Sequence, residues 1–278
     1  MRKCLFVLAL GILFVFNAAA KGLRTPPPST AQTVKQEFAL STVELSYSRP
    51  TMKNRKIFGD LVPYGKVWRT GANAATTITF GEEVQFGGKK VPAGKYGLVT
   101  IPGEQEWTVI LTKQLDVTSP AAYKQDQDVV RLTASAENLP VSVETFMITF
   151  DNATNTSIAL MMIWENTLVA FPIKMEVDSK VMADIDAQMK TAKPPYFQAA
   201  MYYIDNNKDL KKASEWLDKA VKSEPDAYWV WYQNANLKAK LGNKTEAATL
   251  AKKSKELAKA AKNEDYVALN DKLLATLN

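Results

Sequence analysis

The residues best suited to do chemistry in this chain are concentrated between positions 49 and 69. Six cationic side chains stand in this segment against one acid, Asp60. Arginine presents a planar fork of N–H donors that matches carboxylate and phosphate groups, so the segment is suited to hold an anionic group. Its Pro and Gly residues favour a loop of fixed shape. The predicted ligand-binding residues are Arg49, Lys53, Arg55, Trp68, Arg69 and Asn73.

A second interpretation of the same cluster stays open at the level of sequence. The six cations are then solvated on a loop, or they pair with acids elsewhere in the chain, such as Glu82 and Glu83. Under this interpretation, removing the charges of Arg55 and Arg69 alters no ligand affinity.

Composition restricts the other chemistries that are open to the chain. It has no histidine, and its only cysteine is Cys4. These counts exclude triads with histidine, zinc sites of the His/Cys type and thiol chemistry in the mature chain. Five residues separate Gly59 from Gly65, where a phosphate-binding loop has four, and Val67 replaces the magnesium-binding Ser or Thr. We therefore predict no catalytic residue, no metal site and no cofactor.

The elements that must position the cluster are indicated by the residue pattern after position 36. About nine short runs rich in β-branched and aromatic residues are separated by turn residues, without helical segments between them. Gly87-Gly88 marks one turn, and the polar stretch from Asp151 to Asn155 predicts a hairpin over 149–162. The pattern predicts an antiparallel β-sandwich-like domain over residues 36–177.

Residues 178–278 carry helical patterns instead. Asp178 and Ser179 are suited to cap a helix, which ends near Lys193 because Pro194-Pro195 cannot continue it. A shift of 34 residues aligns Ala213 with Ala247, a period typical of tetratricopeptide repeats. We predict a tetratricopeptide-like array of helical hairpins over 194–261 and a final helix over 264–278. Two helical hairpins of no special family remain the alternative.

The first residues predict the destination of the protein. Arg2 and Lys3 precede an apolar run and three alanines, which is the order of a secretory signal peptide. We predict a signal peptide over 1–20, a Pro-rich linker over 21–35, and a periplasmic or secreted protein with no transmembrane span after cleavage. An uncleaved anchor is the alternative.

Several blocks of the first half resemble, in the same order, a bacterial family called domain of unknown function 2911. The blocks are Ser48-Arg49-Pro50, Arg55–Gly59, Leu61–Gly65, Val67–Asn73 and Pro92–Tyr96. The resemblance covers about residues 36–175 and implies an exported bacterial protein, often with a helical repeat tail. It implies no established activity, cofactor or catalytic residue. Ala74 departs from the pattern, because an acidic residue is expected at that position.

Two functional hypotheses follow. In the first, the protein is a non-catalytic binding or scaffold protein of the cell envelope. Its helical repeats hold an envelope protein or peptide, and its arginine loop holds an anionic small molecule or glycan. In the second, it is an enzyme on an anionic or glycan substrate, with Asp60 or Glu82 as the base. A carboxylate that faces the arginines inside a closed pocket would favour the enzyme. Neither half is basic enough to predict nucleic-acid binding.

Overall fold

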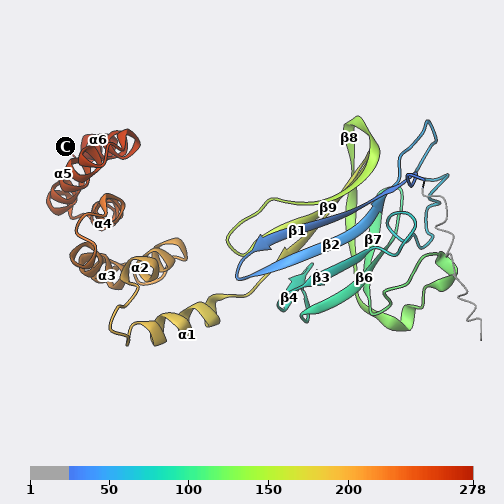
Figure 1. Ribbon diagram of the computed structural model, residues 1–278, viewed down its shortest axis with the longest axis horizontal. Helices are drawn as coiled ribbons and strands as arrows, with labels where there is room; N and C mark the ends of the chain where they lie inside the picture. Colours follow the sequence, from blue (N-terminus) through green and yellow to red (C-terminus); the bar gives the residue numbers. More distant parts are fainter. Residues whose placement is uncertain (1–24, 278) are drawn as a thin grey trace, which may run out of the picture. The chain divides into compact units, whose positions relative to one another are not determined.

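The computed structural model describes residues 25–277 and divides after Met175 into two compact units (Figure 1). The first unit contains the strands and the second contains the α-helices. The predicted signal peptide lies outside the described residues.

The first unit is built on one open sheet of nine strands, each antiparallel to its neighbours. The order across the sheet is β1-β2-β3-β6-β7-β8-β9-β4-β5. The strands are β1 (Thr30–Phe38), β2 (Ser41–Arg49), β3 (Thr77–Phe80), β4 (Val84–Phe86), β5 (Lys89–Val91), β6 (Gly94–Ile101), β7 (Glu106–Thr112), β8 (Asp128–Asp151) and β9 (Ser157–Lys174). The predicted antiparallel strands are confirmed, and so are the turn at Gly87-Gly88 and the hairpin around residues 151–157.

Strand β8 has 24 residues and joins two parts of the sheet. Its beginning pairs with β7, from Asp128 to Ser135, and its remainder pairs with β9, from Ala136 to Asp151. The register with β9 shifts on both sides of Val143. Exposed residues in the middle of β8 interrupt its apolar pattern. For this reason the sequence predicts two short runs where the structure has one long strand.

A buried tyrosine connects β2 with the second part of β8. The Tyr47 hydroxyl donates to the Ile148 carbonyl at 3.1 Å and accepts from the Ile148 N–H at 2.8 Å. Strands that are distant in the sheet order therefore meet at one core. Its largest fully buried side chains are Trp107, Trp164, Phe80, Phe86, Phe146, Phe171, Leu45, Ile57, Ile78, Leu98, Ile110 and Leu111.

The sheet begins earlier than the sequence predicts. Strand β1 starts at Thr30, inside the segment 21–35 that we expected to be a linker. It pairs with β2 along its whole length, from Thr30 opposite Arg49 to Phe38 opposite Ser41. Most of its side chains are exposed or half-buried, so backbone hydrogen bonds rather than apolar side chains hold it in place.

The second unit consists of six helices packed in sequential pairs. They are α1 (Asp178–Gln188), α2 (Tyr196–Asp205), α3 (Leu210–Ser223), α4 (Tyr228–Lys240), α5 (Lys244–Ala260) and α6 (Glu264–Leu277). Ala200 and Tyr203 of α2 pack with Trp216 and Leu217 of α3. None of the helices described in residues 25–277 has the length and apolarity needed to cross a membrane.

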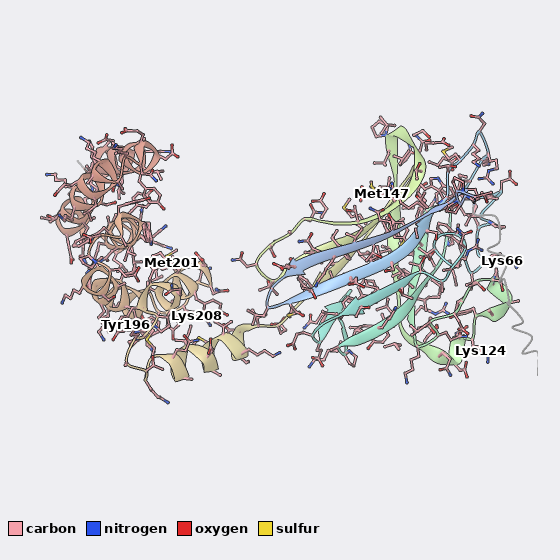
Figure 2. The ribbon with its side chains drawn as sticks, viewed as in Figure 1. Lys66, Lys124, Met147, Tyr196, Met201 and Lys208 are labelled. Atoms are coloured by element: carbon pink, nitrogen blue, oxygen red, sulfur yellow. The ribbon has the colours of Figure 1, made fainter. Side chains whose placement is uncertain are left out.

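Helix α1 differs from its prediction at both ends. It stops at Gln188 rather than near Lys193, and Asp178 is its first residue rather than its cap. The Asp178 carboxylate instead forms an ion pair with Lys208, 2.7 Å away, and accepts a hydrogen bond from the Tyr202 hydroxyl at 2.8 Å. These contacts connect the start of α1 to the end of α2 and the turn that follows it. Figure 2 labels Lys208 among the side chains of the helical unit.

Candidate functional site

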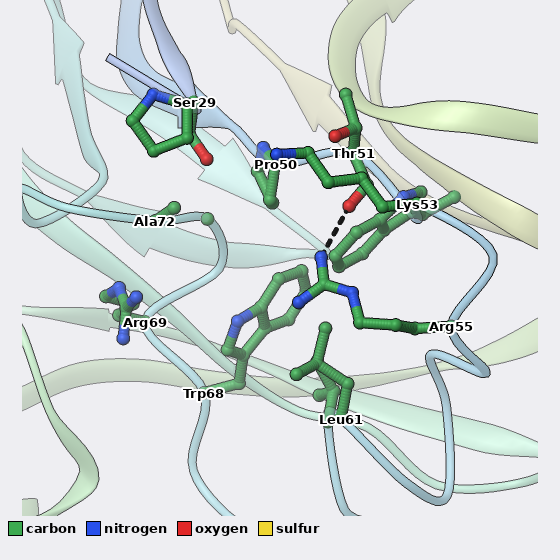
Figure 3. Close-up of a pocket in the computed structure, with 13 residues that line it drawn as sticks. Ser29, Pro50, Thr51, Lys53, Arg55, Leu61, Trp68, Arg69 and Ala72 are labelled. Atoms are coloured by element: carbon green, nitrogen blue, oxygen red, sulfur yellow. Dashed lines mark hydrogen bonds between the residues drawn. The ribbon is translucent and has the colours of Figure 1, made fainter.

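A pocket of about 420 Å³ lies in the first unit, where the loop segments after β2 meet the residues just before β1 (Figure 3). Its lining is Pro28, Ser29, Pro50, Thr51, Lys53, Arg55, Leu61, Val62, Trp68, Arg69, Gly71, Ala72 and Trp164. Four of the six predicted site residues are among them, namely Lys53, Arg55, Trp68 and Arg69. The volume lies within the range of small-molecule sites.

The first wall of the pocket is fixed by hydrogen bonds to β8. The Pro50 carbonyl accepts from the Phe146 N–H, and the Met52 N–H donates to the Glu144 carbonyl, both at 2.9 Å. The chain then turns through Lys53 and Asn54, whose φ angles are +50° and +59°. Two successive non-glycine residues in the left-handed region are uncommon, and such strain is concentrated at functional sites.

This turn determines the direction of the Arg55 side chain. Its Nε donates to the Met52 carbonyl at 2.8 Å, and its Nη2 donates to the Thr51 carbonyl at 2.7 Å (Figure 3). These bonds occupy the edge of the guanidinium formed by Nε and Nη2. The adjacent edge, formed by Nη1 and Nη2, keeps its donors for a ligand.

The second wall is the loop after Trp68. Trp68 and Thr100 of β6 exchange backbone hydrogen bonds of 2.7 and 3.0 Å. Thr70 is buried with φ +56°, an outlier for a β-branched residue. Its carbonyl accepts from the Thr76 hydroxyl at 2.7 Å. Gly71 has φ +152°, and a Cβ there would lie 2.9 Å from the Ser48 carbonyl oxygen. The loop is therefore packed tightly against β2.

This loop places Arg69 across the pocket from Arg55 (Figure 3). Its Nη1 donates to the Thr118 carbonyl at 3.2 Å. Its Nε is buried and has no hydrogen-bond partner among the described residues. A buried donor without a partner loses the free energy of the missing hydrogen bond, so this atom requires an explanation.

An aromatic cluster supports the pocket from below. Trp68 stacks on Trp164 with ring centroids 5.8 Å apart and an interplanar angle of 17°. Phe58 and Phe146 contact both indoles. The Trp164 Nε1 donates to the Glu144 carbonyl at 3.1 Å, whereas the indole N–H of Trp68 has no bond to any described residue. Trp68 thus offers a further donor to the pocket.

The charge of the lining is positive and unbalanced. Lys53, Arg55 and Arg69 form no ion pair with any of residues 25–277. None of the described lining residues is Asp or Glu. The neighbouring carboxylates bind backbone N–H groups: Glu144 accepts from Lys53 at 2.9 Å, and Glu165 accepts from Phe58 at 3.3 Å.

Two predicted site residues, Arg49 and Asn73, do not line the pocket but donate hydrogen bonds to backbone carbonyls around it. Arg49 donates from Nε to the Phe146 carbonyl at 3.1 Å. Burial raises the pKa of Tyr47, although the charge of Arg49 acts in the opposite direction. Asn73 donates from Nδ2 to the Ser29 carbonyl at 3.1 Å and so holds the wall that precedes β1. Asp60 and Glu82, the bases of the enzyme hypothesis, are not lining residues either.

Sequence reasoning missed the lining residues that come from other parts of the chain. Pro28 and Ser29 stand in the segment expected as a linker, and Trp164 lies in β9, far along the chain from the cluster at positions 49–69. No local pattern marks these three, because strand pairing brings them to the loop. Between positions 25 and 277 no group of three or more His, Cys, Asp or Glu could hold a metal ion.

Residues 29–173 match the family described as "Protein of unknown function (DUF2911)". The match starts before position 36, since it includes β1, and it contains every lining residue except Pro28. No curated protein and no solved structure matches the chain.

Proposed function

The chain belongs to the DUF2911 family, whose description assigns no activity, and we propose from its pocket that it binds a small anionic molecule without transforming it. One observation carries the proposal: three unpaired cationic side chains line the pocket together with no carboxylate. A general base is therefore missing from the lining, whereas donors for an anion are abundant.

The rigidity of both walls supports binding rather than a solvated loop. Arg55 is held by two carbonyls of its own turn, and Arg69 by the Thr118 carbonyl. Donors that are oriented before the ligand arrives cost less conformational entropy on binding. Solvated side chains on a loop would have no such fixed partners.

Thermal unfolding in the presence of anions tests the proposal. Glucose 6-phosphate, glucuronate, a nucleotide and a peptidoglycan fragment are titrated against the wild type. Saturable stabilisation of about 2.7 kcal/mol is expected at a hundredfold excess over Kd for at least one compound. The Arg55→Gln/Arg69→Gln variant should lose it. Lys56→Gln is the matched control, because Lys56 is exposed in the same loop and does not line the pocket.

Failure has two forms in this experiment. If none of the anions shifts the unfolding temperature, the proposal is wrong. It is also wrong if the double variant and the control respond equally, because binding would then lie elsewhere.

The helical unit supports a second, independent proposal, that its pairs pack as tetratricopeptide-like repeats and hold an envelope protein or peptide. Ala213, Leu217 and Ala220 of α3 are fully buried. The residues 34 positions later, in α5, are fully buried as well: Ala247, Ala251 and Ser254. A buried pattern that recurs at this period is the physical basis of such repeats.

Two finer points of architecture and location complete the proposal. The two parts of the sheet pack as a sandwich-like domain, which the contact of Tyr47 with Ile148 supports. The protein is exported to the periplasm or beyond, which the charged, apolar and small-residue order of residues 1–20 supports.

A further inference from the structure

The pocket offers more positive charge than a singly charged ligand requires. We propose that its ligand is a small organic phosphomonoester, a molecule with a doubly charged terminal phosphate. This inference rests on the proposed anion-binding function and specifies its ligand. The observations behind it are the cations, the free donors and the apolar wall of the pocket.

Three cations line the pocket without an acid among the described lining residues. The Coulomb attraction of each cation for the ligand doubles when the ligand carries two charges instead of one. A carboxylate or a phosphodiester leaves most of this positive charge uncompensated. A phosphomonoester dianion compensates two of the three charges.

The free donors match the oxygens of a terminal phosphate. Arg55 keeps the edge formed by Nη1 and Nη2, because Thr51 and Met52 occupy its other edge. On the opposite side, Arg69 is held through Nη1 by the Thr118 carbonyl, and its Nη2 has no hydrogen bond to any of residues 25–277. Phosphate has three strong acceptor oxygens, one for each of the three cationic groups of the lining, whereas a carboxylate has two oxygens.

The remainder of the pocket fits an organic group attached to the phosphate. A volume of about 420 Å³ is far larger than a phosphate ion, since one water molecule in the liquid takes about 30 Å³. Leu61, Val62 and Pro28 provide apolar surface, and Trp68 provides an aromatic ring with a free N–H donor. This space is large enough for a ring of the size of benzene or a hexose beside the phosphate.

The decisive comparison uses two probes of the same shape and different charge. Phenyl phosphate is a dianion at pH 7.5 and phenyl sulfate is a monoanion. Isothermal titration calorimetry of the purified protein is expected to give a Kd at least about tenfold lower for phenyl phosphate. Equal affinities for the two probes would overturn the inference that the ligand is a phosphomonoester, while the proposed anion binding would still hold. If neither probe binds, the proposed function fails as well.

The pH dependence of the Kd tests the charge of the ligand, because the phosphomonoester itself titrates near neutral pH. The chain has no histidine, and the charged groups at or beside the pocket are Lys53, Arg55, Arg69, Glu144 and Glu165. The second pKa of a phosphomonoester is about 6, so phenyl phosphate should bind about tenfold more weakly at pH 5 than at pH 7.5. Phenyl sulfate should show no such change. A parallel loss for both probes would contradict the proposal.

Two substitutions distinguish the effect of the Arg55 guanidinium geometry from the effect of positive charge. Arg55→Lys keeps the charge and loses the free edge, and it is expected to weaken phenyl phosphate at least about tenfold. Lys56→Gln removes one charge from the same loop and should keep the ratio of the two Kd values. Wild-type affinity in Arg55→Lys would overturn the assigned geometry.

Discussion

Arg55 takes its direction from the residues just before it in the chain. The two carbonyls that hold its guanidinium belong to Met52 and Thr51, three and four positions earlier. The contact is local, so it forms together with the turn at Lys53 and Asn54. The orientation of the Arg55 guanidinium is therefore set by the loop backbone, and so is that of its edge formed by Nη1 and Nη2.

Gly71 allows the loop that carries Arg69 to pack closely against β2. Its φ of +152° and the 2.9 Å approach of a Cβ to the Ser48 carbonyl both disfavour a side chain. Gly71→Ala is expected to lower the free energy of unfolding by about 2–4 kcal/mol. Denaturant titration of the purified protein measures this change.

Gly65→Ala is the matched control for that substitution. Gly65 also has a positive φ, +69°, but its Cβ would meet nothing within 4 Å. Only the backbone cost of about 1–2 kcal/mol is expected there. If the two variants lose the same stability, the packing of the loop against β2 contributes nothing.

At the scale of elements, one lysine connects three helices. Lys238 of α4 binds Asp218 of α3 at 2.9 Å and Glu246 of α5 at 3.0 Å. Its side chain is only 9% exposed, whereas those of the two acids are about half exposed. Burial tends to lower the pKa of Lys238, but the two hydrogen bonds outweigh it and raise the pKa above its ordinary value. The ammonium stays charged at neutral pH.

Lys238→Met is expected to lower the free energy of unfolding by about 1–3 kcal/mol, because both acids lose their charged donor. Lys240→Met is the control on the same helix, where an exposed lysine should change stability by less than about 0.5 kcal/mol. Thermal or denaturant unfolding measures both variants. An equal effect of the two substitutions would show that the three-helix contact contributes nothing.

Helix α1 depends on a carboxylate that titrates. Hydrogen bonds from Lys208 and then from Tyr202 hold the pKa of Asp178 below its ordinary value of 3.8. The folded pKa is lower than the unfolded one, so this stabilisation is fully present above about pH 4 and is lost as the pH falls through the folded pKa. Hydrogen exchange in α1, corrected for intrinsic rates, is expected to accelerate over that range relative to α5.

Asp178→Asn tests the same contact without a change of pH. It should raise exchange in α1 at neutral pH and abolish the acid response of this helix. If the protection of α1 is the same in the variant and the wild type, Asp178 does not hold the helix.

At the scale of the whole molecule, every lining residue of the pocket belongs to the first unit. A protease site inserted between Met175 and Asp178 would separate the two units. Because no lining residue comes from the second unit, the Kd for phenyl phosphate should change by less than about twofold on cleavage. Calorimetry before and after cleavage measures it. A tenfold loss would mean that the helical unit contributes to the site.

The sequence predicts those features that local patterns encode. Runs rich in β-branched and aromatic residues predict the antiparallel strands. The cluster from Lys53 to Arg69 predicts the cationic residues of both walls of the pocket, because they are close together in the chain. Pro28 is brought to the pocket by the pairing of β1, which follows it, with β2, and Trp164 by the pairing of β9 with β8; strand pairing leaves no local pattern. The sequence likewise does not predict that β8 is one continuous strand, because the exposed residues in its middle have the pattern of a loop.

Because β8 pairs with β7 in its first part and with β9 in its second, it also affects the order in which the chain can fold. Neither part of the sheet is complete without this strand, and the contact of Tyr47 with Ile148 joins residues 101 positions apart. Contacts of such long range close large loops before they gain any stability, and this makes folding slow. A nascent chain that ends before β8 has been synthesised lacks the strand that unites the sheet, so the cationic loop acquires its shape only after β8 has joined.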